Sequence, residues 1–163
     1  MTSFHSYLLA LALSISASES AVAQSAVIEA YPIVGTWQFN REATEALGQA
    51  RDFLARTETY VLNEDGQIEF TVSTVAADGS SSEEMMAWSA SGGITPPDGD
   101  GRSYVEARIS PGRWLVTYLL ADGSQQLTLE KVVSMDGRTM HQTWRGFSED
   151  GQPFEVHAVF DRQ

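Results

Sequence analysis

The sequence contains no cysteine and only one lysine, Lys131. The absence of cysteine excludes disulfide bonds, thiolate metal sites, thiol nucleophiles and a cysteine-linked lipid anchor. Basic residues are few, with ten Lys and Arg against 22 Asp and Glu and a formal net charge of −12 at pH 7. An acidic chain without a basic stripe repels nucleic acid and anionic lipid surfaces, so we expect neither as a partner.

Motifs of common enzyme classes are also absent. The sequence has no GxSxG, P-loop, GxGxxG or HExxH, so no catalytic residue or cofactor is predicted. The run Asp98-Gly99-Asp100-Gly101 resembles the start of a calcium loop but lacks the remaining ligands and the terminal Glu. We expect a tight turn there, and no metal.

The longest apolar run of the sequence is Tyr7–Ala17, and it is too short to span a bilayer. Ala21-Val22-Ala23 then fits the small-x-small pattern of a cleavage site, although no Lys or Arg precedes the apolar run. The sequence predicts a signal peptide over residues 1–23 and one exported domain over residues 24–163, periplasmic or extracellular. The alternative is an apolar tail. We expect no stable membrane insertion.

Turn signals recur along the rest of the chain. Seven of the nine aspartates directly precede a glycine, and Asp-Gly is a strong hairpin-turn signal because both residues tolerate turn conformations. Alternating apolar and polar residues run between these turns, which is the pattern of half-buried strands. The sequence therefore predicts consecutive antiparallel hairpins.

The pattern predicts one helix, Glu42–Ala55, capped by Asn40. It predicts nine strands: Ile33–Phe39, Thr57–Leu62, Ile68–Val75, Glu83–Ala90, Ser103–Ser110, Arg113–Leu120, Gln126–Val133, Thr139–Gly146 and Phe154–Asp161. A closed meander needs an even number, and the Gly/Pro-rich stretch Ser91–Arg102 is where a break could lie. The expected fold is all-β, an antiparallel up-and-down meander closed as a barrel of about 8–10 strands, with one helix after the first strand.

Turn lengths fix which side chains share a face. The turns predict the pairs Val133 with Met140, Lys131 with Gln142, Leu129 with Trp144, Leu62 with Ile68, Tyr60 with Phe70, Trp144 with Val156 and Met140 with Phe160. A two-residue loop at Pro111-Gly112 adds Ile109 with Trp114, Ala107 with Val116 and Val105 with Tyr118. These pairs share an apolar inner face, which leaves Tyr104, Glu106 and Arg108 on the outer face as a solvated set.

Lys131 is predicted on the inner face, where a buried ammonium needs a partner. We hypothesise that Lys131 and Gln142, with Tyr118 nearby, anchor the anionic head of a ligand. Its tail would lie on the apolar wall, where the candidate residues are Phe70, Trp88 and Trp144. The alternative is that Lys131 extends to the barrel mouth or lies outside.

A second polar set is predicted on the outer face, where His141 and His157 lie near a cross-strand pair of Arg145 and Glu155. Two histidines and a carboxylate could bind a metal. An ordinary surface ion pair is the preferred interpretation because Arg145 is the better partner for Glu155.

Gly35-Thr36-Trp37 in the first strand resembles the G-x-W motif of calycins, the lipocalin and fatty-acid-binding group of β-barrels. Arg162, after the last strand, is similar to the arginine that packs over this tryptophan in lipocalins. The stretch Ser134–Gln163 also resembles small exported bacterial lipocalin-like proteins. The Arg-x-Tyr pair of fatty-acid-binding proteins is replaced here by His157-Ala158-Val159-Phe160, so the ligand class does not carry over.

These observations favour an exported barrel that binds a small hydrophobic or amphipathic molecule. One alternative is a filled barrel that acts as an interaction module of the cell envelope. The other is an isomerase or cyclase acting on a lipid-like substrate.

Overall fold

The computed structural model describes residues 25–49, 53–95, 101–148 and 150–163. These form one ten-stranded antiparallel sheet with a short helix after the first strand. The elements are β1 (Gly35–Phe39), α2 (Arg41–Ala46), β2 (Phe53–Leu62), β3 (Gln67–Ala76), β4 (Ser81–Ser89), β5 (Gly93–Thr95), β6 (Ser103–Ser110), β7 (Arg113–Leu119), β8 (Gln125–Val133), β9 (Thr139–Phe147) and β10 (Pro153–Arg162). The predicted all-β meander is confirmed, with a tenth strand, β5, inside Ser91–Arg102. The predicted signal peptide and the residues Asp98 to Asp100 lie outside the described residues.

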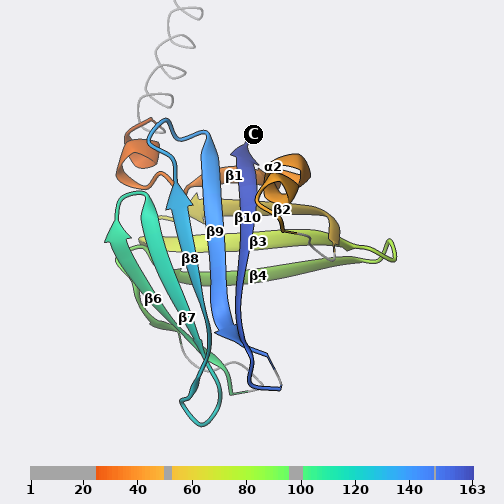
Figure 1. Ribbon diagram of the computed structural model, residues 1–163. Helices are drawn as coiled ribbons and strands as arrows, with labels where there is room; N and C mark the ends of the chain where they lie inside the picture. The colour runs from red at the N-terminus through yellow and green to blue at the C-terminus, as the bar shows by residue number, and fades with distance from the viewer. Residues whose placement is uncertain (1–24, 50–52, 96–100, 149) are drawn as a thin grey trace, which may run out of the picture.

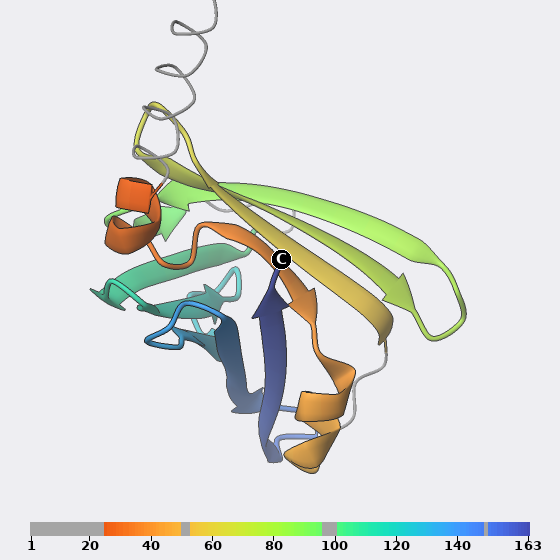
Figure 2. The same ribbon diagram turned by 90° about the horizontal axis from the view of Figure 1, so that it is seen from above.

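The sheet folds over so that its two halves face each other (Figure 1). The strand order is β4-β3-β2-β1-β10-β9-β8-β7-β6-β5, and β1 and β10 join the halves. In the view of Figure 2, the half formed by β2–β4 lies in the upper part of the picture and faces the half formed by β6–β10 in the lower part. The strands β4 and β5 stand at the two ends of this order and are not hydrogen-bonded to each other. The barrel is therefore nearly, but not completely, closed. Helical residues 25–30 lie at one end, beside the β6–β7 and β8–β9 turns.

Most of the predicted register is confirmed. Val133 pairs with Met140, and Lys131 pairs with Gln142 across β8 and β9. The pairs on β2–β3 and β9–β10 are also as predicted. Five hairpins, β2–β3, β3–β4, β7–β8, β8–β9 and β9–β10, turn at an Asp-Gly pair with a left-handed glycine, as at Gly137 (φ +69°).

The register predicted for β6 is wrong. A bulge between Arg108 and Ser110 shifts the strand by one residue, so Arg108, not Ile109, lies opposite Trp114. One residue of slip exchanges the two faces. Glu106 therefore pairs with Val116 on the inner face and is buried, whereas Ile109 is 53% exposed.

The predicted helix Glu42–Ala55 is also wrong in its extent. Asn40 caps α2 as expected, its side chain accepting a hydrogen bond from the Ala43 N–H at 2.8 Å. The helix then ends at Ala46, and Gly48 adopts a left-handed conformation (φ +74°). Phe53 starts β2, with its ring centre 4.7 Å from that of Phe39. Aromatic packing within the sheet overrides the helical spacing.

The core lies between the two halves of the sheet. Its cluster of buried side chains is Ile33, Trp37, Phe39, Tyr60, Ile68, Phe70, Val72, Trp88, Ala90, Trp114, Val133, Met140, Ala158 and Phe160. Within the described residues, no helix is long and apolar enough to cross a membrane.

Candidate functional site

Five polar side chains meet inside the barrel: Arg56, Glu58 and Tyr60 on β2, Lys131 on β8 and Gln142 on β9. We call them the interior polar cluster. Alternate residues of a strand share a face, so the β2 residues point inward together. Glu58 is 0% exposed, Lys131 is 3% exposed and Gln142 is 1% exposed. The cluster therefore connects the two halves of the sheet through the core.

Glu58 is the centre of this cluster. Its Oε1 accepts a hydrogen bond from Arg56 Nε at 2.9 Å. Its Oε2 accepts one from the Tyr60 hydroxyl at 2.5 Å and one from Gln142 Nε2 at 2.6 Å. Lys131 Nζ lies 3.6 Å from the same oxygen and donates to the Tyr60 hydroxyl oxygen. One carboxylate thus serves two cations and two neutral donors.

The surroundings determine the charge of each member. Burial raises the pKa of Glu58, but the charges of Lys131 and Arg56 and the hydrogen bonds from Tyr60 and Arg56 outweigh it, so the net pKa lies below its usual value. Burial and the Glu58 charge raise the pKa of Tyr60 well above its usual value. Burial lowers the pKa of Lys131, the Glu58 charge raises it and Arg56 lowers it further, so the net pKa lies below its usual value. With Arg56 and Lys131 protonated and Glu58 ionised, the cluster carries one net positive charge.

Arg56 connects the cluster with solvent. Its side chain is 26% exposed, whereas that of Glu58 is fully buried and that of Lys131 is 4% exposed. The other end of its guanidinium donates to Thr74 Oγ1 at 3.5 Å. The excess positive charge is therefore accessible from the Arg56 side.

Three buried polar atoms among the described residues have no hydrogen-bond partner: Gln142 Oε1, Trp114 Nε1 and Trp88 Nε1. Trp114 lies opposite Lys131 in the β7–β8 ladder, so two of these atoms belong to neighbours of Lys131. Burying an unpaired polar atom costs about 1–3 kcal/mol. The interior therefore has hydrogen-bonding capacity that the described side chains leave unused.

The described residues cover the inner face only in part at the end of the barrel away from helical residues 25–30. There the strands β7–β10 extend past β4 (Figure 1). Inward-facing residues on these strands are only half-buried: Tyr118, Leu127, Trp144, Phe154 and Val156. Part of the apolar wall is thus accessible to solvent or to a ligand.

The structure places all six predicted site residues on the inner face. Lys131 Nζ lies 4.5 Å from the centre of the Phe70 ring, and Phe70 contacts Trp88 at 5.7 Å between ring centres. Lys131 and Gln142 are brought together at Glu58. The hydroxyl beside Lys131 is that of Tyr60, whereas Tyr118 pairs with Leu127 further along β7. Trp144 lies near the open end.

Sequence reasoning missed Glu58 and Arg56. The signal was present, because Tyr60 was assigned to the inner face and alternation along the same strand puts Glu58 beside it. A charged residue in a strand is by default assigned to solvent, and this default was wrong here. The outer-face prediction for Tyr104, Glu106 and Arg108 is also wrong. The β6 bulge places them opposite the inward-facing residues Tyr118, Val116 and Trp114.

The histidine-bearing face is an ion-pair network. Arg145 Nε lies 2.6 Å from Glu155 Oε2, and Arg145 Nη1 lies 3.3 Å from Glu130 Oε2. His157 Nε2 lies 3.0 Å from the other oxygen of Glu155. The predicted cross-strand pair is confirmed, and in the described part of the chain no group of three His, Asp or Glu is arranged to hold a metal ion.

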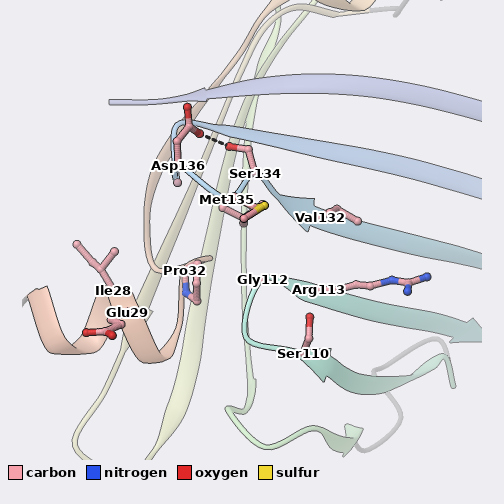
Figure 3. A pocket seen from close by; sticks show the side chains of 12 residues that line it. Ile28, Glu29, Pro32, Ser110, Gly112, Arg113, Val132, Ser134, Met135 and Asp136 are labelled. Carbon is pink, nitrogen blue, oxygen red and sulfur yellow. Dashed lines mark hydrogen bonds between the residues drawn. The ribbon is translucent and has the colours of Figure 1, made fainter.

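A pocket of about 530 Å³ lies at the opposite end of the barrel (Figure 3). Helical residues 25–30 and Pro32 form one wall, and the β6–β7 and β8–β9 turns form the other. Met135 at the tip of the second turn is fully exposed. None of the interior polar cluster lines this pocket, so it is a separate surface feature.

Arg162 and Trp37 hydrogen-bond to the backbone of residues 32–34 and hold this segment against the barrel. The guanidinium lies 4.2 Å from the centre of the Trp37 ring, as the resemblance implied. It donates to the carbonyl oxygens of Gly137 at 2.6 Å and Val34 at 2.7 Å. Trp37 Nε1 donates to the Ile33 carbonyl oxygen at 2.7 Å. This arrangement and the meander define a calycin-like β-barrel.

No family model and no curated protein sequence matches the chain. Solved structures do. The chain is similar to secretory abundant heat soluble protein 4 from Ramazzottius varieornatus, with 11% identity over 81% of this chain and 95% of that one and a TM-score of 0.54. It is also similar to a variant of the fluorescent protein UnaG, with 13% identity over 81% of this chain and 96% of that one and a TM-score of 0.53. A third similar structure is that of Rv2717c from M. tuberculosis, with 16% identity over 85% of this chain and 97% of that one and a TM-score of 0.50. At these identities the likeness shows the fold alone.

Proposed function

We propose that the protein is an exported carrier of a small amphipathic molecule. The anionic group of the ligand would lie at the interior polar cluster, beside Lys131, Gln142 and Arg56. Its apolar part would lie along Phe70, Trp88, Trp144 and Tyr118. Export is proposed from the apolar run Tyr7–Ala17 and the small residues that follow it.

The observation that carries this proposal is the imbalance of charge around Glu58. A structural ion pair needs one cation for each carboxylate, and here Arg56 and Lys131 share one. An unbalanced charge is costly where water is excluded, and a ligand carboxylate, sulfate or phosphate would offset it. The chain places this cationic centre in its interior although its overall charge is −12.

The half-buried inner wall supports the apolar part of the proposal. Tyr118, Leu127 and Trp144 face inward but remain partly exposed. Covering such surface contributes about 25 cal/mol for each Å² of apolar area removed from water. A ligand that reaches from the cluster to the open end would gain both the ionic and the apolar contribution.

Isothermal titration with dodecanoate and with 1-dodecanol tests the proposal. We expect dodecanoate to bind at least about tenfold more tightly than the alcohol. Lys131→Met should abolish this preference, because it leaves Glu58 balanced by Arg56 alone. Arg138→Met is the matched control, because it removes one positive charge from an exposed turn residue, and it should leave the preference intact. Equal binding of the two ligands, or no saturable binding, would refute the carrier and favour a filled envelope module.

A further inference from the structure

A pocket of about 210 Å³ lies at the seam of the barrel, where β4 and β5 are the unpaired ends of the sheet. We call it the seam pocket. It is lined by Gln67, Ala87, Trp88, Ser89, Gly93, Ile94, Thr95 and Glu106. Most of these side chains are small or apolar, and Glu106 is the one ionisable group among them. The pocket therefore combines a single carboxyl with an apolar and aromatic wall.

Glu106 differs from the other buried carboxyl of the described residues, Glu58. Glu58 has two cationic partners. Glu106 is 5% exposed, and the Thr95 hydroxyl donates to its two carboxylate oxygens at 3.2 and 3.3 Å. No cationic side chain of the described residues pairs with it. Burial raises its pKa, and only hydrogen bonds oppose that effect. A buried carboxylate without a cation is costly, so this position favours a cation from outside the chain.

Trp88 provides the aromatic wall. Its side chain is 6% exposed and packs against the rings of Tyr60 and Phe70. Tryptophan is the aromatic side chain that attracts cations most strongly. Among the described residues, its Nε1–H has no hydrogen-bond partner, so we follow the NMR signal of this group as the probe of an occupant.

We propose that the seam pocket binds a small organic cation, a primary ammonium group on a short apolar chain. Glu106 would be its counterion, and Trp88, Ala87 and Ile94 would contact its apolar part. The volume suits a molecule of a few carbon atoms, and the acidic surface of the chain favours the approach of cations. The seam pocket is separate from the interior polar cluster, because none of the five cluster side chains lines it. The proposal does not depend on the proposed carrier function.

The test is a titration with n-butylammonium chloride followed by the four tryptophan indole N–H signals in ¹H–¹⁵N spectra at constant ionic strength. A Trp88→Phe spectrum assigns the Trp88 signal. We expect a saturable shift confined to Trp88. The neutral analogue n-butanol should produce no saturable shift, and both titrations are made on the natural protein.

Variants sharpen the result. Glu106→Gln should weaken n-butylammonium binding by about tenfold or more, because it removes the buried counterion. Glu69→Gln, which removes an exposed carboxylate on neighbouring β3, should leave the affinity unchanged. The proposal is overturned if n-butanol shifts Trp88 equally, if no signal saturates, or if Glu106→Gln binds as the natural protein does.

Discussion

The Glu58 carboxylate on β2 lies 3.6 Å from the Lys131 ammonium on β8, and this ion pair crosses the interior from one half of the barrel to the other. The pair is almost completely buried, with exposed side-chain fractions of 0% and 4%. Its two members are not equivalent. Glu58 is shared by two cations, so removing it leaves two charges unpaired, whereas removing Lys131 leaves none.

This asymmetry makes the first prediction. Glu58→Gln should lower the free energy of unfolding by about 3–5 kcal/mol, because it leaves the buried Lys131 ammonium, together with the partly exposed Arg56 guanidinium, without a counter-charge. Lys131→Met should lower the free energy of unfolding far less, because Glu58 keeps Arg56, Tyr60 and Gln142 as partners. Urea unfolding of both variants at pH 7 measures the difference. Similar losses for the two variants would show that the cluster is not centred on Glu58.

The second prediction concerns acid. The folded state lowers the pKa of Glu58, so the stabilisation from its ionised form is present above the unfolded pKa and is lost as the pH falls through the folded pKa. The stability of the natural protein should therefore approach that of Glu58→Gln as the pH is lowered below about 4.5. Unfolding curves from pH 7 to pH 3 measure this gap. A gap that stays constant would contradict the ionised state of Glu58.

A third prediction concerns Glu106, whose pKa shift is opposite in direction to that of Glu58. Burial raises its folded pKa, so the folded state binds more protons than the unfolded state, and stability falls as the pH rises from about 4.5 through the folded pKa. Glu106→Gln avoids this loss and should become progressively more stable than the natural protein between pH 4 and pH 7. Glu69→Gln is the exposed control and should show a much smaller change. A pH-independent difference for Glu106→Gln would mean that its carboxyl is not buried.

The fourth prediction concerns the contact of Gly35 with Arg162. A Cβ atom on Gly35 would clash with Arg162 Nη1, and Gly35 also has φ +135°. The guanidinium is held by the Val34 and Gly137 carbonyls and cannot move freely. Gly35→Ala should destabilise the protein by about 3 kcal/mol.

Gly79→Ala is the matched control for this contact. Gly79 has φ +84° but nothing within 4 Å of its added Cβ, so it reports the backbone cost alone, about 1 kcal/mol. Thermal unfolding of both variants separates steric from backbone strain. Equal losses would show that Arg162 yields to the added methyl group.

Local chemistry explains why most of the fold was predictable. In the described part of the chain, an Asp-Gly turn between two strands fixes their pairing, as for Val133 with Met140, and alternation fixes the faces. The two main errors have different causes. Phe53 belongs to β2 because of its contact with Phe39, which lies on another strand. The β6 register was wrong because a bulge between Arg108 and Ser110, directly before the Pro111-Gly112 turn, adds one residue that the turn length alone does not reveal.

The candidate site was predictable in part for the same reason. Lys131 and Gln142 are neighbours in one hairpin, so their meeting followed from a single turn. Glu58 reaches them from a strand far away in the sequence, and only the closure of the barrel brings it there. Alternation could place Glu58 on the inner face, but no local rule could select Lys131 as its partner.

The most direct test of the central claim is the pKa of a bound ligand carboxyl. Dodecanoate labelled with ¹³C at the carboxyl carbon is bound to the protein, and its carboxyl shift is followed by NMR as the pH is varied. The net positive charge of Arg56, Lys131 and Glu58 should lower the bound carboxyl pKa below that of free dodecanoate, and Lys131→Met should reverse this effect. A bound pKa equal to or above the free value, unchanged by Lys131→Met, would contradict an anion site at the interior polar cluster.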